Sequence, residues 1–283
     1  MTTQEEIQPG CSPSECGTKE ACQGCKSNPN AAQEQKPLPH HIRKVFAVVS
    51  GKGGVGKSMV TALTAVQLRR MGYKVGVLDA DITGPSIPHM FGIHDQAVSD
   101  GEHILPARSA NDIAIMSMNL LLPDAGDPVI WRGPVLSGVV GQFWTDVAWG
   151  ELDVLLIDMP PGTGDVPLTI FQQLPIDGII VVSSPQQMVS MIVRKAIKMA
   201  EMMNIPTLGF VENMSYMACP DCGKKLYPWG ERNIAEEVES LGLPLLAQLP
   251  IVPGNTALCD DGQVEKCQMP ELSGVVDVIA AKL

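Results

Sequence analysis

The chain carries the stretch Gly51-Lys52-Gly53-Gly54-Val55-Gly56-Lys57-Ser58 directly after the apolar run VFAVVS at residues 45–50. This stretch satisfies the pattern G-x-x-x-x-G-K-[ST], and residues 58–70 after it have the composition of a helix. A strand, a glycine-rich turn and a helix in this order predict a phosphate-binding loop. The glycines let the backbone curl so that successive N–H groups point at phosphate oxygens, and the N-terminus of the helix adds positive potential.

Two lysines in this loop have different expected roles. We expect Lys57 to reach the β- and γ-phosphates of a bound nucleotide, and the hydroxyl of Ser58 to bind Mg²⁺. Lys52 is a second lysine, whereas an ordinary phosphate-binding loop needs only one. Two interpretations of Lys52 are open: a solvated surface lysine, or a residue that neutralises charge on the nucleotide of a partner subunit, as an arginine finger does.

Three aspartates end two other apolar runs, at the sheet edge where doubly wound folds bind their ligands. Asp79 and Asp81 end the run KVGVLDAD, and alternation along a strand puts both carboxylates on one side. They fit one acid that orients the attacking water and another that holds the metal or a switch loop; the alternative is a pair of loop-capping aspartates. Asp158 ends the run DVLLID and precedes MPPGTGD, which fits an acid that contacts Mg²⁺ through water.

Composition excludes several classes of protein. The 283 residues include 20 Lys and Arg against 31 Asp and Glu, which gives a formal charge of −11 and disfavours binding to nucleic acids and anionic membranes. Hydrophobic residues make up 45% of the chain and charged residues 18%, so the chain has material for a large core. No apolar run approaches the roughly 20 residues that cross a bilayer. We therefore expect a cytoplasmic protein that binds neither nucleic acid nor membrane.

The composition and the hydrophobic pattern of the chain change near residue 40. Residues 1–40 are polar, rich in cysteine and without a helical or strand period, which predicts a disordered tail. Residues 41–283 contain short apolar runs, such as VFAVVS, DVLLID and DGIIVVSS, that are apolar at consecutive positions and so fit strands covered on both faces. Helices are expected at residues 58–70, 186–204 and 271–283. The prediction is one α/β domain with a doubly wound, mostly parallel sheet.

A pair of cysteines, Cys219 and Cys222, lies in the sequence Cys-Pro-Asp-Cys-Gly. Two thiolates are half of the Cys₄ set that a 4Fe-4S cluster or a structural zinc ion requires, and a symmetric dimer would complete it. The residues alone leave three interpretations open: a cluster, a zinc knuckle or a redox dithiol.

Four more cysteines, Cys11, Cys16, Cys22 and Cys25, lie in the tail. They supply four thiolates from one chain, and the open interpretations are a second 4Fe-4S cluster, zinc, or no stable metal. Cys259 and Cys267 stand apart from both groups, and isolated thiols of this kind are usually small buried hydrophobes, so we expect them to be structural.

Five stretches of the chain carry a family resemblance: KGGVGKS, LDADITGPSIPHMFG, WRGP at residues 131–134, WGELDVLLIDMPPGTGD and VENMSYMACPDC. With these stretches the sequence resembles the Mrp/ApbC group of iron–sulfur cluster carrier ATPases. The group belongs to the class of P-loop NTPases with a deviant Walker A loop that also contains MinD, ParA and the nitrogenase iron protein. The resemblance extends from about residue 40 to the C-terminus. It implies an ATP-dependent homodimer that binds a labile 4Fe-4S cluster and passes it to apo-proteins.

The resemblance also implies roles by position. Lys52 resembles the signature lysine that crosses the dimer, Asp81 the acid that orients water, and Asp158 the Walker B acid. Asn213 resembles the residue that bonds adenine, and Cys219 with Cys222 the ligands of the bridging cluster. The expected catalytic residues are Lys52, Lys57 and Asp81; the expected ATP-binding residues are Gly51, Lys52, Gly53, Gly54, Val55, Gly56, Lys57, Ser58, Met59 and Asn213; the expected Mg²⁺ ligands are Ser58, Asp79 and Asp158.

Two other functions are alternatives to that of a cluster carrier. A MinD- or ParA-like positioning ATPase with a structural zinc knuckle would share the loop, but its membrane-surface helix would need a basic polar face, which residues 271–283 lack. A reductase component like the nitrogenase iron protein would hold its cluster with separated cysteines rather than a C-x-x-C pair. Hydrolysis is expected to be slow in a single chain, because Lys52 would complete the site only from a partner.

Overall fold

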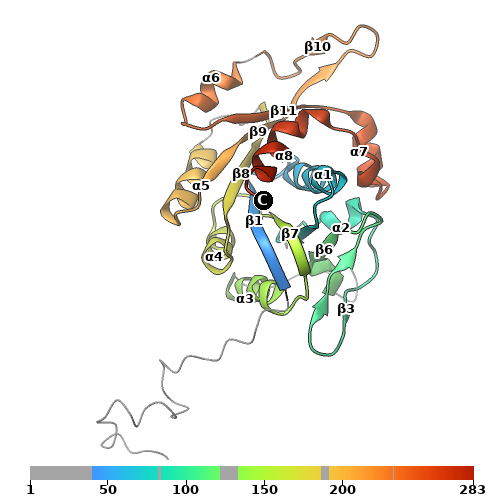
Figure 1. Ribbon diagram of the computed structural model, residues 1–283. Helices are drawn as coiled ribbons and strands as arrows, with labels where there is room; N and C mark the ends of the chain where they lie inside the picture. Colours follow the sequence, from blue (N-terminus) through green and yellow to red (C-terminus); the bar gives the residue numbers. More distant parts are fainter. Residues whose placement is uncertain (1–39, 82–83, 122–132, 186–190, 232) are drawn as a thin grey trace, which may run out of the picture. The chain divides into compact units, whose positions relative to one another are not determined.

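A computed structural model describes residues 40–283 of the protein apart from residues 82–83, 122–132, 186–190 and 232. Nine strands in this part of the chain form one sheet in the order β10-β9-β8-β1-β7-β2-β6-β5, and β11 pairs with β9 (Figure 1). All neighbouring pairs are parallel except β5 with β6 and β10 with β9. The strands are β1 His40–Ser50, β2 Val75–Asp79, β5 Ala107–Arg108, β6 Ala114–Ser117, β7 Gly150–Asp158, β8 Gly178–Ser183, β9 Thr207–Ala218, β10 Lys225–Leu226 and β11 Leu245–Pro250, with a separate hairpin of β3 Val98–Ser99 and β4 Ile104–Leu105.

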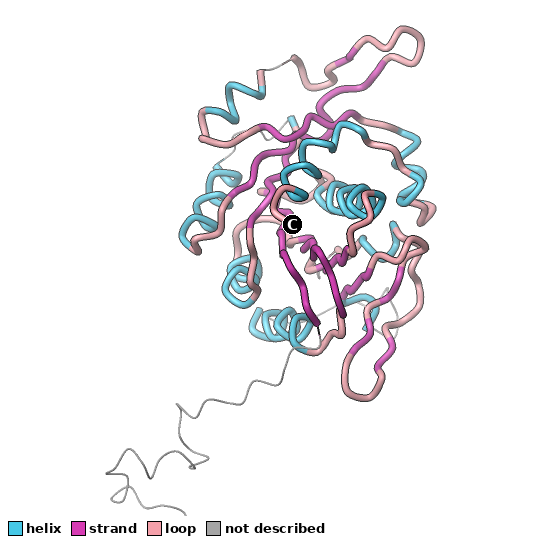
Figure 2. The backbone as a smooth tube through the Cα atoms, in the orientation of Figure 1, coloured by secondary structure: helices cyan, strands magenta, loops and turns pink. Residues whose placement is uncertain are grey.

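Helices cover both faces of the sheet (Figure 2). One face packs against α1 Lys57–Arg70, α2 Ile87–Met90, α7 Pro253–Asp260 and α8 Ser273–Ala280. The other packs against α3 Gly133–Thr145, α4 Asp165–Gln173, α5 Met191–Met202 and α6 Ile234–Glu239. Short 3-10 helices lie at Met118–Leu121, Val264–Lys266 and Pro270–Leu272.

The apolar runs explain this layering. In β1 the side chains alternate between the two cores, since Phe46 and Val48 belong to the core under α1 and Val45, Ala47 and Val49 to the core under α3, α4 and α5. A strand buried on both faces needs apolar residues at consecutive positions. The predicted doubly wound, mostly parallel α/β sheet is therefore confirmed.

Element boundaries depart from the prediction in three places. Strand β1 begins at His40, because residues before the apolar run also pair with β7, His40 opposite Gly150. The helix expected at residues 186–204 is described only as α5, since residues 186–190 lie outside the described part. The helix expected at residues 271–283 is shorter, because a 3-10 turn at Pro270–Leu272 precedes α8. The tail prediction falls on residues 1–39 and lies outside the described residues.

No helix among the described residues is both long enough and apolar enough to cross a lipid bilayer.

Candidate functional site

The glycine-rich loop joins the carboxyl end of β1 to the N-terminus of α1. Two of its glycines have left-handed backbones, Gly54 with φ 79° and Gly56 with φ 77°. A Cβ atom at Gly56 would lie 2.2 Å from Nδ2 of Asn213, so this position has no room for a side chain. Glycine is the residue that adopts such a backbone without steric cost. The loop therefore has the curled form that directs its N–H groups, with the helix N-terminus, toward an anion.

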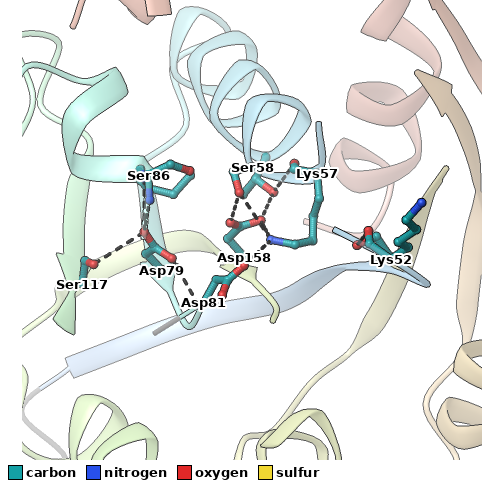
Figure 3. Close-up of polar contacts among 11 residues, drawn as sticks. Lys52, Lys57, Ser58, Asp79, Asp81, Ser86, Ser117 and Asp158 are labelled. Carbon is teal, nitrogen blue, oxygen red and sulfur yellow. Dashed lines mark hydrogen bonds and ion pairs between the residues drawn. The ribbon is translucent and has the colours of Figure 1, made fainter. Parts of the chain in front are cut away.

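Three predicted residues meet at the base of this loop (Figure 3). Nζ of Lys57 lies 2.7 Å from Oδ1 of Asp158 and 3.3 Å from Oγ of Ser58. The Ser58 hydroxyl donates to the other oxygen of Asp158 at 2.5 Å. The side chain of Lys57 is 5% exposed and that of Asp158 is fully buried. Lys57 and Asp158 thus form a buried ion pair.

Burial governs the ionisation of Asp158. Loss of water raises the pKa of its carboxyl, while the Lys57 ammonium and the hydroxyls of Ser58 and Thr61 counter part of that rise. Thr61 donates to Oδ1 of Asp158 at 3.0 Å and to the carbonyl of Lys57 at 3.0 Å. These contacts aim the carboxylate at the start of α1.

The two aspartates after β2 have different surroundings. Oδ2 of Asp81 lies 3.9 Å from Nζ of Lys57, so Asp81 faces the loop. Asp79 accepts backbone N–H bonds from Asp81 at 3.2 Å and from Ser86 and Ile87 at 3.1 Å each. Burial raises the pKa of Asp79 well above its usual value, and the nearby Asp158 raises it further. Asp79 therefore holds the backbone of the loop after β2, as the capping interpretation expects, while its assignment as a Mg²⁺ ligand stays a prediction.

Lys52 has a different position from Lys57. Its residue is exposed, and Figure 3 shows the side chain pointing away from the Lys57–Asp158 pair. Its carbonyl accepts a hydrogen bond from the Ser50 hydroxyl at 3.1 Å, which fixes the start of the loop while leaving the ammonium in solvent. In this orientation the Lys52 ammonium is turned away from Lys57 and Asp158.

A cavity of about 310 Å³ opens beside the loop. The segment after β7 forms part of its wall through Pro161, and it is tied to β1 because Met159 N–H donates to the Val48 carbonyl at 3.1 Å and Gly162 N–H to the Ser50 carbonyl at 2.9 Å. The Pro-Pro-Gly stretch at residues 160–162 is thereby held next to the loop. The lining residues are Ser50, Lys52, Gly53, Gly54, Gly56, Lys57, Ser58, Met59, Asp81, Gly84, Ser86, Met90 and Pro161.

Asn213 on β9 lies directly under the loop. Its Nδ2 donates to the Val55 carbonyl at 2.9 Å, and the residue is fully buried. Its Oδ1 is buried without a hydrogen-bond partner among the described residues. A buried acceptor without a partner costs free energy, so this oxygen is suited to a donor that the structure does not contain.

The predicted cysteine pair lies away from the loop, at a turn between β9 and β10. Cys219 is half-buried and Cys222 exposed. Backbone N–H groups of Cys222 and Asp221 donate to the Cys219 sulfur and lower the pKa of this thiol. Gly223, with φ 70°, closes the turn by donating to the Cys219 carbonyl at 2.9 Å. Within the described residues no group of three or more potential metal ligands occurs, so this cysteine hairpin, residues 217–226, offers two thiols only.

Comparison with known proteins identifies the family. Residues 41–283 match the ParA family described as NUBPL iron-transfer P-loop NTPases. The chain belongs to this family. A protein of Clostridium perfringens named iron-sulfur cluster carrier protein is 49% identical over 234 residues, which cover 80% of this chain and 82% of that protein. A protein of the same name from Methanocaldococcus jannaschii is 45% identical over 241 residues, covering 83% and 82%.

Solved structures agree with this NTPase family. The nucleotide-binding protein of Archaeoglobus fulgidus in complex with ADP is 44% identical, has a TM-score of 0.73, and covers 82% of this chain and 91% of that chain. The cell division ATPase MinD of Pyrococcus furiosus has a TM-score of 0.56 at 20% identity, covering 84% and 97%, and shows the shared fold alone.

Sequence reasoning missed two residues of the iron-transfer NTPase site. Thr61 holds Asp158, and its place one helical turn after Lys57 is a signal that the pattern of α1 contains. Met214 packs against Gly56 from β9, a contact that no local pattern indicates. Two predicted sets lie outside the described residues. One is the tail cysteines Cys11, Cys16, Cys22 and Cys25, and the other is the first half of the WRGP stretch, residues 131–132.

Proposed function

We propose that this protein is an ATPase that carries a 4Fe-4S cluster between two copies of the chain and transfers it to apo-proteins in the cytoplasm. The observation that carries this proposal is an exposed hairpin with only two thiols, Cys219 and Cys222, on a nucleotide-binding NTPase fold. Relatives between 40% and 49% identical to this chain bear the name iron-sulfur cluster carrier protein, which supports the cluster as cargo.

The nucleotide site has the groups that phosphoryl transfer needs. The loop N–H groups and Lys57 would hold the phosphates, and Asp81 would orient the attacking water. Ser58 and Asp158 fit Mg²⁺, because their oxygens already lie 2.5 Å apart and hard oxygen donors are the ligands this ion prefers. When bound, the ion would neutralise charge on the β- and γ-phosphates.

Lys52 would act across a dimer. Its side chain is exposed and points away from its own Lys57–Asp158 pair, which suits a lysine that reaches the nucleotide of a second copy. Because that charge comes only from the partner, hydrolysis by a single chain would be slow. Dimer formation would therefore control turnover.

Asn213 would select the base. Its Oδ1 is an acceptor that has no hydrogen-bond partner in the described part of the chain. The 6-amino group of adenine is a donor, whereas guanine presents an oxygen at that position. A site that pairs a buried polar group rejects a ligand that leaves the group unpaired. We therefore assign ATP rather than GTP as the nucleotide.

The cluster would be shared by two hairpins. A 4Fe-4S cluster takes four cysteine thiolates, and a two-fold axis beside the cysteine hairpin brings two pairs together. The lowered pKa of Cys219 favours the thiolate that binds iron. An exposed position of Cys222 also allows a recipient protein to approach the cluster.

The test is the iron and sulfide content of the full chain after anaerobic reconstitution. We expect a variant with Cys219→Ala and Cys222→Ala to lose about four irons per dimer relative to wild type. A second variant, in which the four tail cysteines are alanine, measures any iron held by the tail and should keep the hairpin cluster. Equal iron in wild type and the hairpin variant would refute the proposal.

Zinc in place of iron would favour the second candidate, a positioning ATPase with a structural knuckle. The turn at Cys219, with backbone N–H groups directed at sulfur, also suits a tetrahedral zinc site. Metal analysis of the protein isolated without oxygen, before any reconstitution, separates the two functions.

A further inference from the structure

One strand connects the nucleotide site to the cysteine hairpin. Strand β9 carries Asn213 under the glycine-rich loop and leads directly into Cys219 at the start of the turn. Cys219 lies six positions after Asn213, which corresponds to about 20 Å of extended chain. A displacement at the loop therefore has a short covalent path to the thiols.

This path contains a β-bulge. Glu212 pairs with Gln248 of β11, and the next pair along the ladder joins Tyr216 to Pro250. Between these pairs β11 advances by two residues and β9 by four, so residues 213–215 of β9 lie opposite the single residue Leu249, an excess of two residues. Bulges occur next to functional sites, where they re-aim side chains. Here the bulge directs Asn213 and Met214 toward the loop.

Met214 has an unusual backbone. Its φ is 57°, in the left-handed region that residues other than glycine rarely adopt. Its Cε lies 3.4 Å from the position that a Cβ at Gly56 would occupy, beside the Asn213 amide at 2.2 Å. A strained residue that persists only because its surroundings hold it, and that touches the phosphate-binding loop, is suited to respond when the loop moves.

The bulge is anchored on its upstream side. Glu212 is buried, pairs with Ser183 of β8 and with Gln248 of β11, and its carboxylate accepts from the Ser215 hydroxyl at 2.7 Å and from Nε2 of Gln248 at 2.8 Å. Nε2 of Gln248 also donates to Oγ of Ser215 at 3.2 Å. Glu212 is thus fixed to two neighbouring strands, and Ser215, the last residue of the bulge, is bonded to the same Glu212–Gln248 pair.

On the downstream side the bulge leads to the hairpin through Tyr216. The Tyr216 carbonyl accepts from Ile251 N–H at 2.7 Å, and Nζ of Lys225 lies 4.1 Å from the centre of the Tyr216 ring. The rings of Tyr216 and Tyr227 are 6.2 Å apart. Lys225 of β10 and Tyr227 just after that strand therefore pack on Tyr216, the first residue after the bulge.

We propose that the bulge at residues 213–215 transmits the nucleotide state of the glycine-rich loop to the cysteine hairpin, with Met214 as the contact and the Glu212–Gln248 pair as the fixed end. Because the upstream side is anchored, a shift of Gly56 displaces the chain toward Tyr216 and changes the exposure of Cys222. This coupling between the loop and the hairpin rests on the proposed function in one respect: its purpose is to link ATP to cluster release.

The test needs no iron. The full-length apo-protein is treated with iodoacetamide at pH 8, and mass spectrometry follows the alkylation rates of Cys219 and Cys222 without nucleotide, with Mg-ADP and with a non-hydrolysable ATP analogue. Each variant is measured at a nucleotide concentration that saturates it. In wild type we expect the rate at Cys222 to change by about fivefold or more between these states.

Two variants break the path at different points. Met214→Ala removes the contact with Gly56, and Gln248→Met removes a donor from the anchor; in each we expect the nucleotide effect on Cys222 to fall to less than about twofold. Met202→Ala, at a methionine that is 71% exposed on α5, is the matched control and should behave as wild type. Protection that arises only from dimer contacts would persist in both variants and would overturn the inference.

An unchanged alkylation rate in wild type would also overturn the inference. That result would leave iron loading at Cys219 and Cys222 untouched, since it concerns the apo-protein. Conversely, failure to load iron would refute the carrier function, but the alkylation rates of the apo-protein would still test the coupling.

Discussion

Nζ of Lys57 lies 2.7 Å from Oδ1 of Asp158, and this ion pair is closed off from solvent between the glycine-rich loop and β7. Each charge is the main partner of the other in a region of low dielectric. Burying two charges is expensive, and their attraction offsets that cost only while both are present. The pair therefore keeps Lys57 in place at the base of the glycine-rich loop.

Removal of the acid should expose this dependence. In Asp158→Asn the Lys57 ammonium loses its counter-charge, and we expect the free energy of unfolding to fall by about 3 kcal/mol. Urea denaturation without nucleotide measures it. Asp112→Asn is the control. The Asp112 side chain is 67% exposed although it forms ion pairs with Arg69 and Arg108, so this change should lower the free energy of unfolding by less than about 1 kcal/mol. Equal losses in the two variants would contradict a stabilising buried pair.

Lys52→Ala should keep nucleotide binding and lose hydrolysis by about 10³-fold or more, because the missing charge is supplied in trans. Steady-state phosphate release and nucleotide titration measure the two properties. Lys282→Ala, at an exposed lysine near the C-terminus, is the control.

Mixing provides a sharper check of the same lysine. Lys57→Ala should also be inactive alone, but a heterodimer of Lys52→Ala and Lys57→Ala subunits contains one site with both lysines. We expect mixing the two inactive variants to restore activity. No recovery, with heterodimers shown to form, would exclude a lysine that acts across the interface.

Gly56→Ala should disrupt the loop. The φ of 77° and the 2.2 Å approach of Asn213 to a Cβ leave no room for a methyl group, and the left-handed backbone alone costs about 1–2 kcal/mol. We expect weaker ATP binding and a lower midpoint of thermal unfolding. Gly164→Ala tests the context, since a Cβ there meets nothing within 4 Å and its φ is −82°. ATP binding by Gly56→Ala as tight as that of Gly164→Ala would show that the loop rearranges freely.

Stability at alkaline pH should depend on Cys259. Burial, with a contribution from Cys267, raises the pKa of this thiol from 9.0 to about 12. Below pH 9 the thiol is neutral in folded and unfolded chains and its contribution to stability is fully present. Between pH 9 and about 12 the unfolded chain ionises while the folded chain does not, so the free energy of unfolding falls. Cys259→Val should show a shallower fall in urea titrations across this range, and an identical slope would contradict the shift.

Sequence patterns were sufficient to predict the fold class, because each of the signals that indicate it is local. The run of apolar residues in β1 required cover on both faces, and the glycine-rich loop required a strand before it and a helix after it. The 3-10 turn before α8 was not predictable in this way, because the same apolar pattern fits a continuous helix. Pairing partners, such as β11 with β9, were also absent from the local signals.

The sequence by itself determined which residues could do chemistry: the lysine and serine of a phosphate-binding loop, the acids that end two strands, and a C-x-x-C pair. Only the tertiary structure decided how they are used. Asp79 and Asp81 are two residues apart, yet Asp79 accepts the N–H groups of its own loop while Asp81 faces Lys57. The bulge that brings Met214 to Gly56 arises from mismatched pairing between distant strands. Such contacts depend on closing long loops and on burial, and neither is encoded in the spacing of neighbouring residues.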